Sequence, residues 1–249
     1  MIDLLRTWWR RRQAARLAIP PSLWQEVESG LPLLARLTAS ERRRLRQLAR
    51  EFVVSKEWTG AAELQLTPRI QLAIALQACL LVLNLDLDFY AGWVGIVVYP
   101  GDFHTPRQRV DEAGVVHEFD ETLLGEAWAG GPVLVSWFDP PEALDGINPV
   151  IHEFAHQIDM KNGRADGLPP LHGDMSVARW GTAMNAAFAD LQQRLEHGHG
   201  TAIDPYAAES PAEFFAVVSE VFFETPRILR NAYPRVFAQL ALFYRQHPE

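Results

Sequence analysis

Two histidines four residues apart, His152 and His156, enclose a glutamate at position 153. On a helix, side chains at positions i and i+4 project side by side, so these two imidazoles can bind one metal ion together. Glu153 follows His152 on the same helix, where its carboxylate can reach a water on that ion without binding the ion itself. This H-E-x-x-H spacing is typical of zinc hydrolases in which the glutamate is the general base.

The residues around the motif predict the helix that this chemistry requires. Asn148 is a good N-cap, and Pro149 suits the first helical position because its missing N–H would be unpaired there. Apolar residues then repeat with the spacing of one buried helix face: Ile151, Phe154, Ala155 and Ile158. We expect this helix to run to about Met160 and to stop before Gly163.

A catalytic zinc ion needs a third protein ligand and an open position for water. The metzincin pattern is excluded because position 159 is aspartate and position 162 is asparagine. A later glutamate is then the best expectation, and a helix predicted over residues 211–223 offers Glu213 and Glu220. These two residues are seven apart and share nearly the same helix face, so spacing alone does not choose between them.

Each candidate acidic residue also has a purely structural interpretation. Glu213 follows Ser210 by three positions, which fits a capping box at the start of the helix. Glu220 is equally suited to an outer carboxylate beside a metal ligand or to a surface position. Asp159 is a candidate partner that orients His156.

The rest of the sequence predicts an α+β protein. The first 90 residues are mainly helical in pattern, with Ser40 as an expected N-cap. Residues 93–99 and 132–138 have the composition of strands, and residues 115–119 form a shorter candidate. We therefore expect a small mixed or antiparallel sheet between the helical N-terminal part and the catalytic helices. The edge of the strand at 132–138 is a candidate partner for an extended substrate backbone.

The domain organisation follows from the same pattern. Residues 1–90 are expected to form the helical part and residues 91–249 the catalytic domain. Because no linker divides the chain, we expect the two to pack as one compact unit.

Charge is unevenly distributed along the 249 residues, whose net charge is −8. Residues 1–51 contain eleven arginines but only five acidic residues. Such a basic segment is compatible with nucleic-acid contact. We favour a solvated helix face, because residues 42–44 lie on a predicted helix with an ordinary apolar stripe. No direct nucleic-acid partner is expected.

The cysteine content and the apolar segments of the sequence favour a cytoplasmic location. The single cysteine, Cys79, lies in an apolar stretch and is expected to be a buried thiol in a reducing compartment. The basic N-terminus lacks the continuous apolar segment of a secretory signal. The longest apolar run, residues 72–85, is shorter than the roughly 20 residues of a membrane-spanning helix. We expect no membrane association.

Four segments closely resemble the Mlc titration factor A family: INPVIHEFAHQIDMKNG, DPYAAESPAEFFAVVSEVFF, QACLLVL and GPVLVSWFD. The resemblance extends from about residue 23 to residue 237. The catalytic half is also similar to the metalloprotease domain of anthrax lethal factor. That domain has the same H-E-x-x-H motif, followed by a tyrosine and, seven residues later, the glutamate of A-E-F-F-A. Tyr206 and Glu213 occupy these positions here.

The resemblance implies a zincin-like fold and assigns roles to individual residues. His152, His156 and Glu213 would bind one Zn²⁺ per chain, in the arrangement called gluzincin. Glu153 would be the catalytic base, and Tyr206 would face the reacting carbonyl.

The resemblance also implies a function, that of a zinc metallopeptidase with aminopeptidase activity acting on peptides or proteins. A role in binding a Mlc-like transcriptional repressor, and thereby regulating sugar uptake, is implied as well. A non-catalytic protein that only sequesters such a repressor is the alternative. A zinc hydrolase of non-peptide substrates is a third interpretation.

Overall fold

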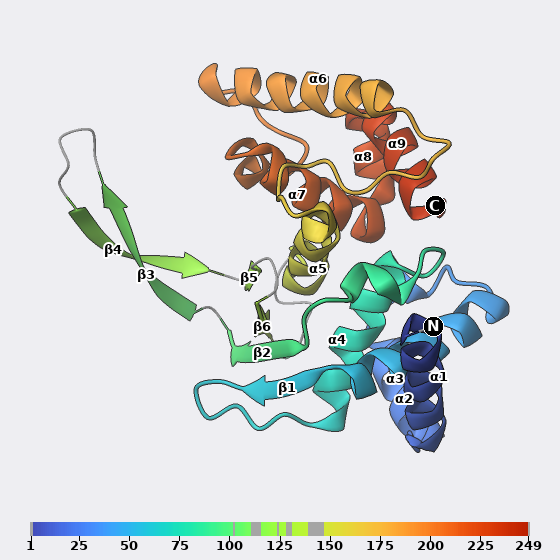
Figure 1. Ribbon diagram of the computed structural model, residues 1–249. Helices are drawn as coiled ribbons and strands as arrows, with labels where there is room; N and C mark the ends of the chain where they lie inside the picture. The colour runs from blue at the N-terminus through green and yellow to red at the C-terminus, as the bar shows by residue number, and fades with distance from the viewer. Residues whose placement is uncertain are drawn as a thin grey trace.

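The computed structural model places a group of N-terminal helices and a group of C-terminal helices around a small sheet (Figure 1). It describes residues 2–101, 103–110, 116–123, 125–127, 131–138 and 147–248. The N-terminal helices are α1 (Ile2–Arg16), α2 (Pro21–Ser29), α3 (Ala39–Ser55) and α4 (Pro68–Leu81), with short 3₁₀ turns at Pro32–Leu34 and Leu87–Tyr90. The C-terminal helices are α5 (Pro149–Asp159), α6 (Val177–Glu196), α7 (Pro211–Glu224), α8 (Pro226–Ala232) and α9 (Pro234–Tyr244), with 3₁₀ turns η4 (Met160–Asn162) and η5 (Pro205–Ala208). The α+β prediction is confirmed.

The main sheet is mixed, with strand order β1-β2-β6-β5. Strands β1 (Glu57–Gly60), β2 (Gly95–Pro100) and β6 (Val133–Trp137) are parallel, whereas β5 (Gly125–Ala127) is antiparallel to β6. Strands β3 (Phe103–Val110) and β4 (Val116–Leu123) form a separate antiparallel pair. The strands predicted at 93–99, 115–119 and 132–138 correspond to β2, β4 and β6, although residue 115 lies outside the described residues.

One expectation about the sheet is wrong. Residues Val133, Leu134 and Val135 pair with β2 on one side and with β5 on the other. The strand at 132–138 is therefore internal at these positions, and β5 forms the edge of the sheet. The order of strands depends on contacts between distant segments, which the local strand pattern does not contain.

The N-cap of helix α3 lies two residues before the predicted one. Thr38, not Ser40, is the N-cap: its hydroxyl accepts a hydrogen bond from the Glu41 backbone N–H at 3.3 Å, and the Glu41 carboxylate accepts one from the Thr38 backbone N–H at 2.8 Å. This capping box provides acceptors for two backbone N–H groups, whereas the Ser40 hydroxyl alone would provide one. Thr38 is therefore the more favourable N-cap.

Several of the N-terminal arginines are paired within the fold. Arg42 and Arg46 contact Glu28, which joins α3 to α2. Arg10 contacts Glu51 at 3.1 Å, which joins α1 to α3. These arginines therefore hold the helical part together.

One continuous apolar core extends from Trp24 on α2 to Tyr244 on α9. Phe154 of α5 contributes to it, packing edge-on against Phe52 and Tyr90 with ring centroids 5.5 and 5.3 Å apart. Such burial of an aromatic side chain contributes about 2 kcal/mol or more, so α5 is anchored against the N-terminal helices. The division of the chain near residue 90 stays a prediction.

In the part of the chain that the structure describes, every helix is too short or too polar to cross a lipid bilayer.

Gly167 ties three C-terminal elements together. Its N–H donates to the Asp159 carboxylate at 2.7 Å, and its carbonyl accepts from the Trp180 indole at 3.0 Å. Its φ is +76°, and a Cβ at this position would lie 2.4 Å from the Pro211 carbonyl oxygen. Only glycine satisfies both restrictions without strain.

Gly167→Ala is expected to lower the free energy of unfolding by about 2 kcal/mol or more, because it adds left-handed strain and a backbone clash. Urea unfolding followed by circular dichroism measures the loss. Gly173→Ala is the matched control, since a Cβ there meets nothing within 4 Å. Equal stability of the two variants would contradict this account of Gly167.

Candidate metal centre

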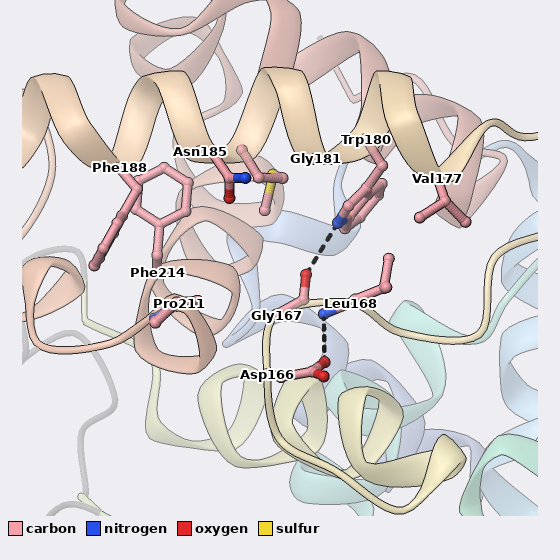
Figure 2. A pocket seen from close by; sticks show the side chains of 11 residues that line it. Asp166, Gly167, Leu168, Val177, Trp180, Gly181, Asn185, Phe188, Pro211 and Phe214 are labelled. Atoms are coloured by element: carbon pink, nitrogen blue, oxygen red, sulfur yellow. Dashed lines mark hydrogen bonds between the residues drawn. The ribbon is translucent and has the colours of Figure 1, made fainter.

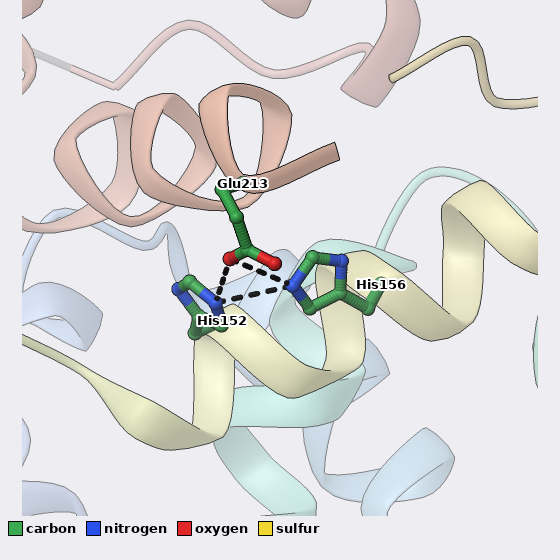
Figure 3. A group of neighbouring side chains, drawn as sticks. All are labelled: His152, His156 and Glu213. Carbon is green, nitrogen blue, oxygen red and sulfur yellow. Dashed lines mark hydrogen bonds and ion pairs between the residues drawn. The ribbon is translucent and has the colours of Figure 1, made fainter. Parts of the chain in front are cut away.

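His152 and His156 on α5 face Glu213 on the first turn of α7 (Figure 3). Glu213 Oε2 lies 3.0 Å from His152 Nε2 and 3.3 Å from His156 Nε2, and the two Nε2 atoms are 3.1 Å apart. The structure therefore brings together the three residues that the sequence and the resemblance nominate as ligands.

Local signals position the two helices. Asn148 caps α5 by accepting a hydrogen bond from the Ile151 N–H at 2.9 Å, as the sequence predicts. Ser210 caps α7 in the same way, accepting from the Glu213 N–H at 3.1 Å. The backbone N–H of Glu213 thus takes part in the cap. Among the described contacts, its carboxylate binds to the histidines and not back to the start of the helix.

Glu220 lies two turns further along α7 and contacts the other nitrogen of His152. Its Oε1 is 2.7 Å from His152 Nδ1. Glu220 Oε1 can accept the Nδ1–H of His152, while the other ring nitrogen, Nε2, is directed at Glu213. Glu220 thus contacts a candidate ligand histidine from the outside, which is one of the three roles that the sequence left open for it.

The donor set fits a divalent metal ion. Two imidazole nitrogens and one carboxylate oxygen are the ligands of many catalytic zinc sites, with bonds of about 2.0–2.2 Å. Atoms so arranged around a tetrahedral ion lie roughly 3.4 Å apart, close to the separations of 3.0–3.3 Å between these three atoms. His152, His156 and Glu213 would hold the ion.

The charges of the site are mutually dependent. Burial lowers the pKa of His152, but the Glu220 and Glu213 carboxylates outweigh it and hold this pKa well above its ordinary value. Burial raises the pKa of Glu213, but hydrogen bonds from His152 and His156 outweigh it and lower that pKa to about 2. Both directions show that the centre favours positive charge beside an ionised carboxylate.

The two residues nominated for catalysis lie beside the ligands. Glu153 is 4% exposed and follows His152 on α5. Tyr206 lies in η5 with its ring centroid 6.0 Å from that of His152. Its side chain is 40% exposed, so it borders the site from the solvent side.

Asp159 interacts electrostatically with His156, and its role as a partner that orients His156 stays a prediction. Its carboxylate accepts a hydrogen bond from the Gly167 N–H, and it is fully buried. Burial raises the pKa of this carboxyl to about 6. The hydrogen bond from Gly167 makes Asp159 an anchor for the loop that follows α5.

A cavity of about 220 Å³ lies between α6 and the first turn of α7 (Figure 2). Pro211 and Phe214 line it, together with Trp180 and Met184 of α6. The lining contains none of the three ligand residues. The cavity is therefore separate from the metal centre, although it borders the same turn that carries Glu213.

The sequence matches the family described as glucose-regulated metallo-peptidase M90 over residues 5–245. The chain belongs to this family. It is 38% identical over 245 residues to Mlc titration factor A of Edwardsiella ictaluri, covering 96% of this chain and 92% of that protein. It is 38% identical over 232 residues to Mlc titration factor A of Klebsiella pneumoniae, covering 90% of this chain and 86% of that protein.

Mlc titration factor A of Escherichia coli is 36% identical over 247 residues, covering 96% of this chain and 91% of that protein. The resemblance inferred from the four sequence segments is thereby confirmed. The H-E-x-x-H helix and Glu213 both lie inside the region matched to the M90 family.

Glu220→Gln is expected to weaken metal binding on the order of 10- to 100-fold, because it removes the charge that orients His152. Competition with a chromophoric chelator measures this affinity in the purified protein. Glu196→Gln, at the exposed end of α6, is the matched control and should bind metal as the wild type does. Unchanged affinity in Glu220→Gln would remove Glu220 from the site.

Proposed function

We propose that this M90 protein is a zinc-dependent peptidase of the gluzincin type, with His152, His156 and Glu213 as the zinc ligands. The observation that carries the proposal is the convergence of three ligand atoms between α5 and α7. The contact between Glu220 and His152 supports it further, because zinc-bound histidines commonly donate their other N–H to a carboxylate.

When bound, a zinc ion supplies a Lewis acid and lowers the pKa of a coordinated water from about 15.7 towards ~7. Glu153 is buried beside the ligands and would accept the proton of that water. Tyr206, at the rim, would donate a hydrogen bond to the oxyanion that forms on the peptide carbonyl. A preorganised donor of this kind contributes on the order of 3 kcal/mol.

We also propose a preference for one end of the peptide, a strand that binds the substrate backbone, and a cellular location. A preference for peptide N-termini, which is an aminopeptidase activity, rests on the family resemblance alone. We propose β5, one of the two edge strands of the main sheet, as the partner for an extended substrate backbone. A cytoplasmic location is supported by the single, buried cysteine, Cys79. Hydrolysis of a non-peptide substrate uses the same centre and is the competing enzyme class.

Glu153→Gln is expected to abolish peptide hydrolysis while one zinc ion per chain stays bound, because it removes the base and leaves the ligands. His152→Ala should lose both zinc and activity. Metal analysis of the purified variants, together with turnover of a panel of aminoacyl and internally quenched peptides, measures both effects. If Glu153→Gln still hydrolysed peptides at the wild-type rate, the mechanism would be refuted.

A second function, binding of a transcriptional repressor, is favoured by the name of the relatives, Mlc titration factor A. We propose that this chain binds a repressor of the Mlc type and thereby affects sugar uptake. In the non-catalytic alternative, the protein only sequesters the repressor, and peptide hydrolysis is not needed for its function.

The Glu153→Gln protein separates the two functions, because the substitution keeps the shape of the site. We expect it to bind a Mlc-type repressor with wild-type affinity in isothermal titration calorimetry. Loss of binding in this variant would tie repressor recognition to the catalytic centre. An absence of binding by the wild-type protein would refute the repressor hypothesis.

A further inference from the structure

Asn148 makes more contacts than helix capping requires. Its Oδ1 accepts the capping hydrogen bond from Ile151. Its Nδ2 donates to Gln77 Oε1 on α4 at 2.7 Å and to Glu224 Oε1 on α7 at 2.6 Å. Its backbone N–H donates to Glu220 Oε2 at 2.7 Å. Asn148 therefore joins α4, α5 and α7 at one point.

The hydrogen bond from the Asn148 backbone N–H to Glu220 connects Asn148 to the metal centre. Glu220 uses one carboxylate oxygen for the Asn148 N–H and the other for His152 Nδ1. Asn148 also begins the helix on which His152 lies, and its carbonyl accepts the His152 N–H at 3.0 Å. The orientation of the His152 ring is thus set by a closed loop of contacts that passes through Asn148 and Glu220.

Burial makes this network restrictive. Asn148 is 9% exposed, and Gln77 and Glu220 are each 4% exposed. A buried donor or acceptor that loses its partner costs about 1–3 kcal/mol, so alternative side-chain positions at Asn148 are disfavoured. Asparagine combines one acceptor for the cap with two amide donors for the flanking helices. Serine and aspartate serve as caps but lack those two donors.

We propose that Asn148 is a positioning residue for the metal centre: through its contacts with Gln77 and Glu224 it fixes the backbone N–H that holds Glu220, and thereby the zinc-binding orientation of His152. This inference deepens the proposed function and rests on it. It also makes α4 of the N-terminal part a support of the metal site, because Gln77 accepts one of the two amide hydrogens of Asn148.

Asn148→Ser tests the proposal, because serine keeps the cap and removes both amide donors. Zinc affinity, measured by chelator competition, is expected to fall on the order of 10-fold. The midpoint of thermal unfolding reports the cap separately. Ser176→Ala removes the N-cap of α6, far along the chain from the motif, and should lower thermal stability without changing zinc affinity.

Gln77→Met gives a second route that leaves α5 and its cap intact. It keeps the side-chain volume and removes the acceptor for Asn148, so zinc affinity should again fall while helix content is kept. With zinc in excess, both variants should recover most of the wild-type kcat, because Glu153 and the ligands themselves are unchanged.

The results distinguish three cases. Weakened zinc binding in Asn148→Ser and Gln77→Met, with Ser176→Ala unchanged, supports the positioning role. Wild-type zinc affinity in either of these two network variants overturns it and leaves Asn148 as a helix cap only. If the wild-type protein itself binds no zinc in the same titration, the proposed function fails, and this inference falls with it.

Discussion

Three electron-rich atoms, two imidazole nitrogens and one carboxylate oxygen, lie within 3.3 Å of one another between α5 and α7. Atoms of this kind repel one another unless positive charge lies among them. A protonated imidazole or a bound cation can supply this charge, so the fold must hold the three side chains where positive charge is favoured. Much of the C-terminal half of the protein serves to hold these three side chains close together.

The support comes mainly from apolar packing on the other faces of the two helices. Phe154 fixes α5 against Phe52 and Tyr90 of the N-terminal part. Phe214 and Phe222 are almost fully buried on α7, which carries Glu213 and Glu220. Because both helices are anchored on their apolar faces, Glu213 and Glu220 of α7 are held facing His152 of α5.

The sequence predicts the local parts of this arrangement well. The α5 helix, its Asn148 cap and the strands at β2 and β6 are encoded by neighbouring residues, so periodicity and capping rules find them. At α3, Ser40 and Thr38 are both suitable cap residues, and the T-x-x-E spacing to Glu41 is the local signal that favours Thr38.

The non-local parts could not be derived from residue patterns. Glu213 lies 57 residues beyond His156 in the chain, and nothing in its own helix distinguishes it from Glu220. Only the family resemblance nominated it. The order of strands, which makes β5 the edge, and the contact between Gln77 and Asn148 both depend on how distant segments pack.

The division of roles between Glu213 and Glu220 follows from helix geometry. Seven residues of α7 span roughly 10 Å along its axis and return to nearly the same face, so the two carboxylates lie along one line. The two ring nitrogens of His152 point in different directions, and each meets one of these carboxylates. Glu220, the more deeply buried, meets Nδ1, whereas Glu213, in the first turn, lies beside the Nε2 atoms of both histidines. A single helix thus orients the ring of one candidate ligand and supplies another.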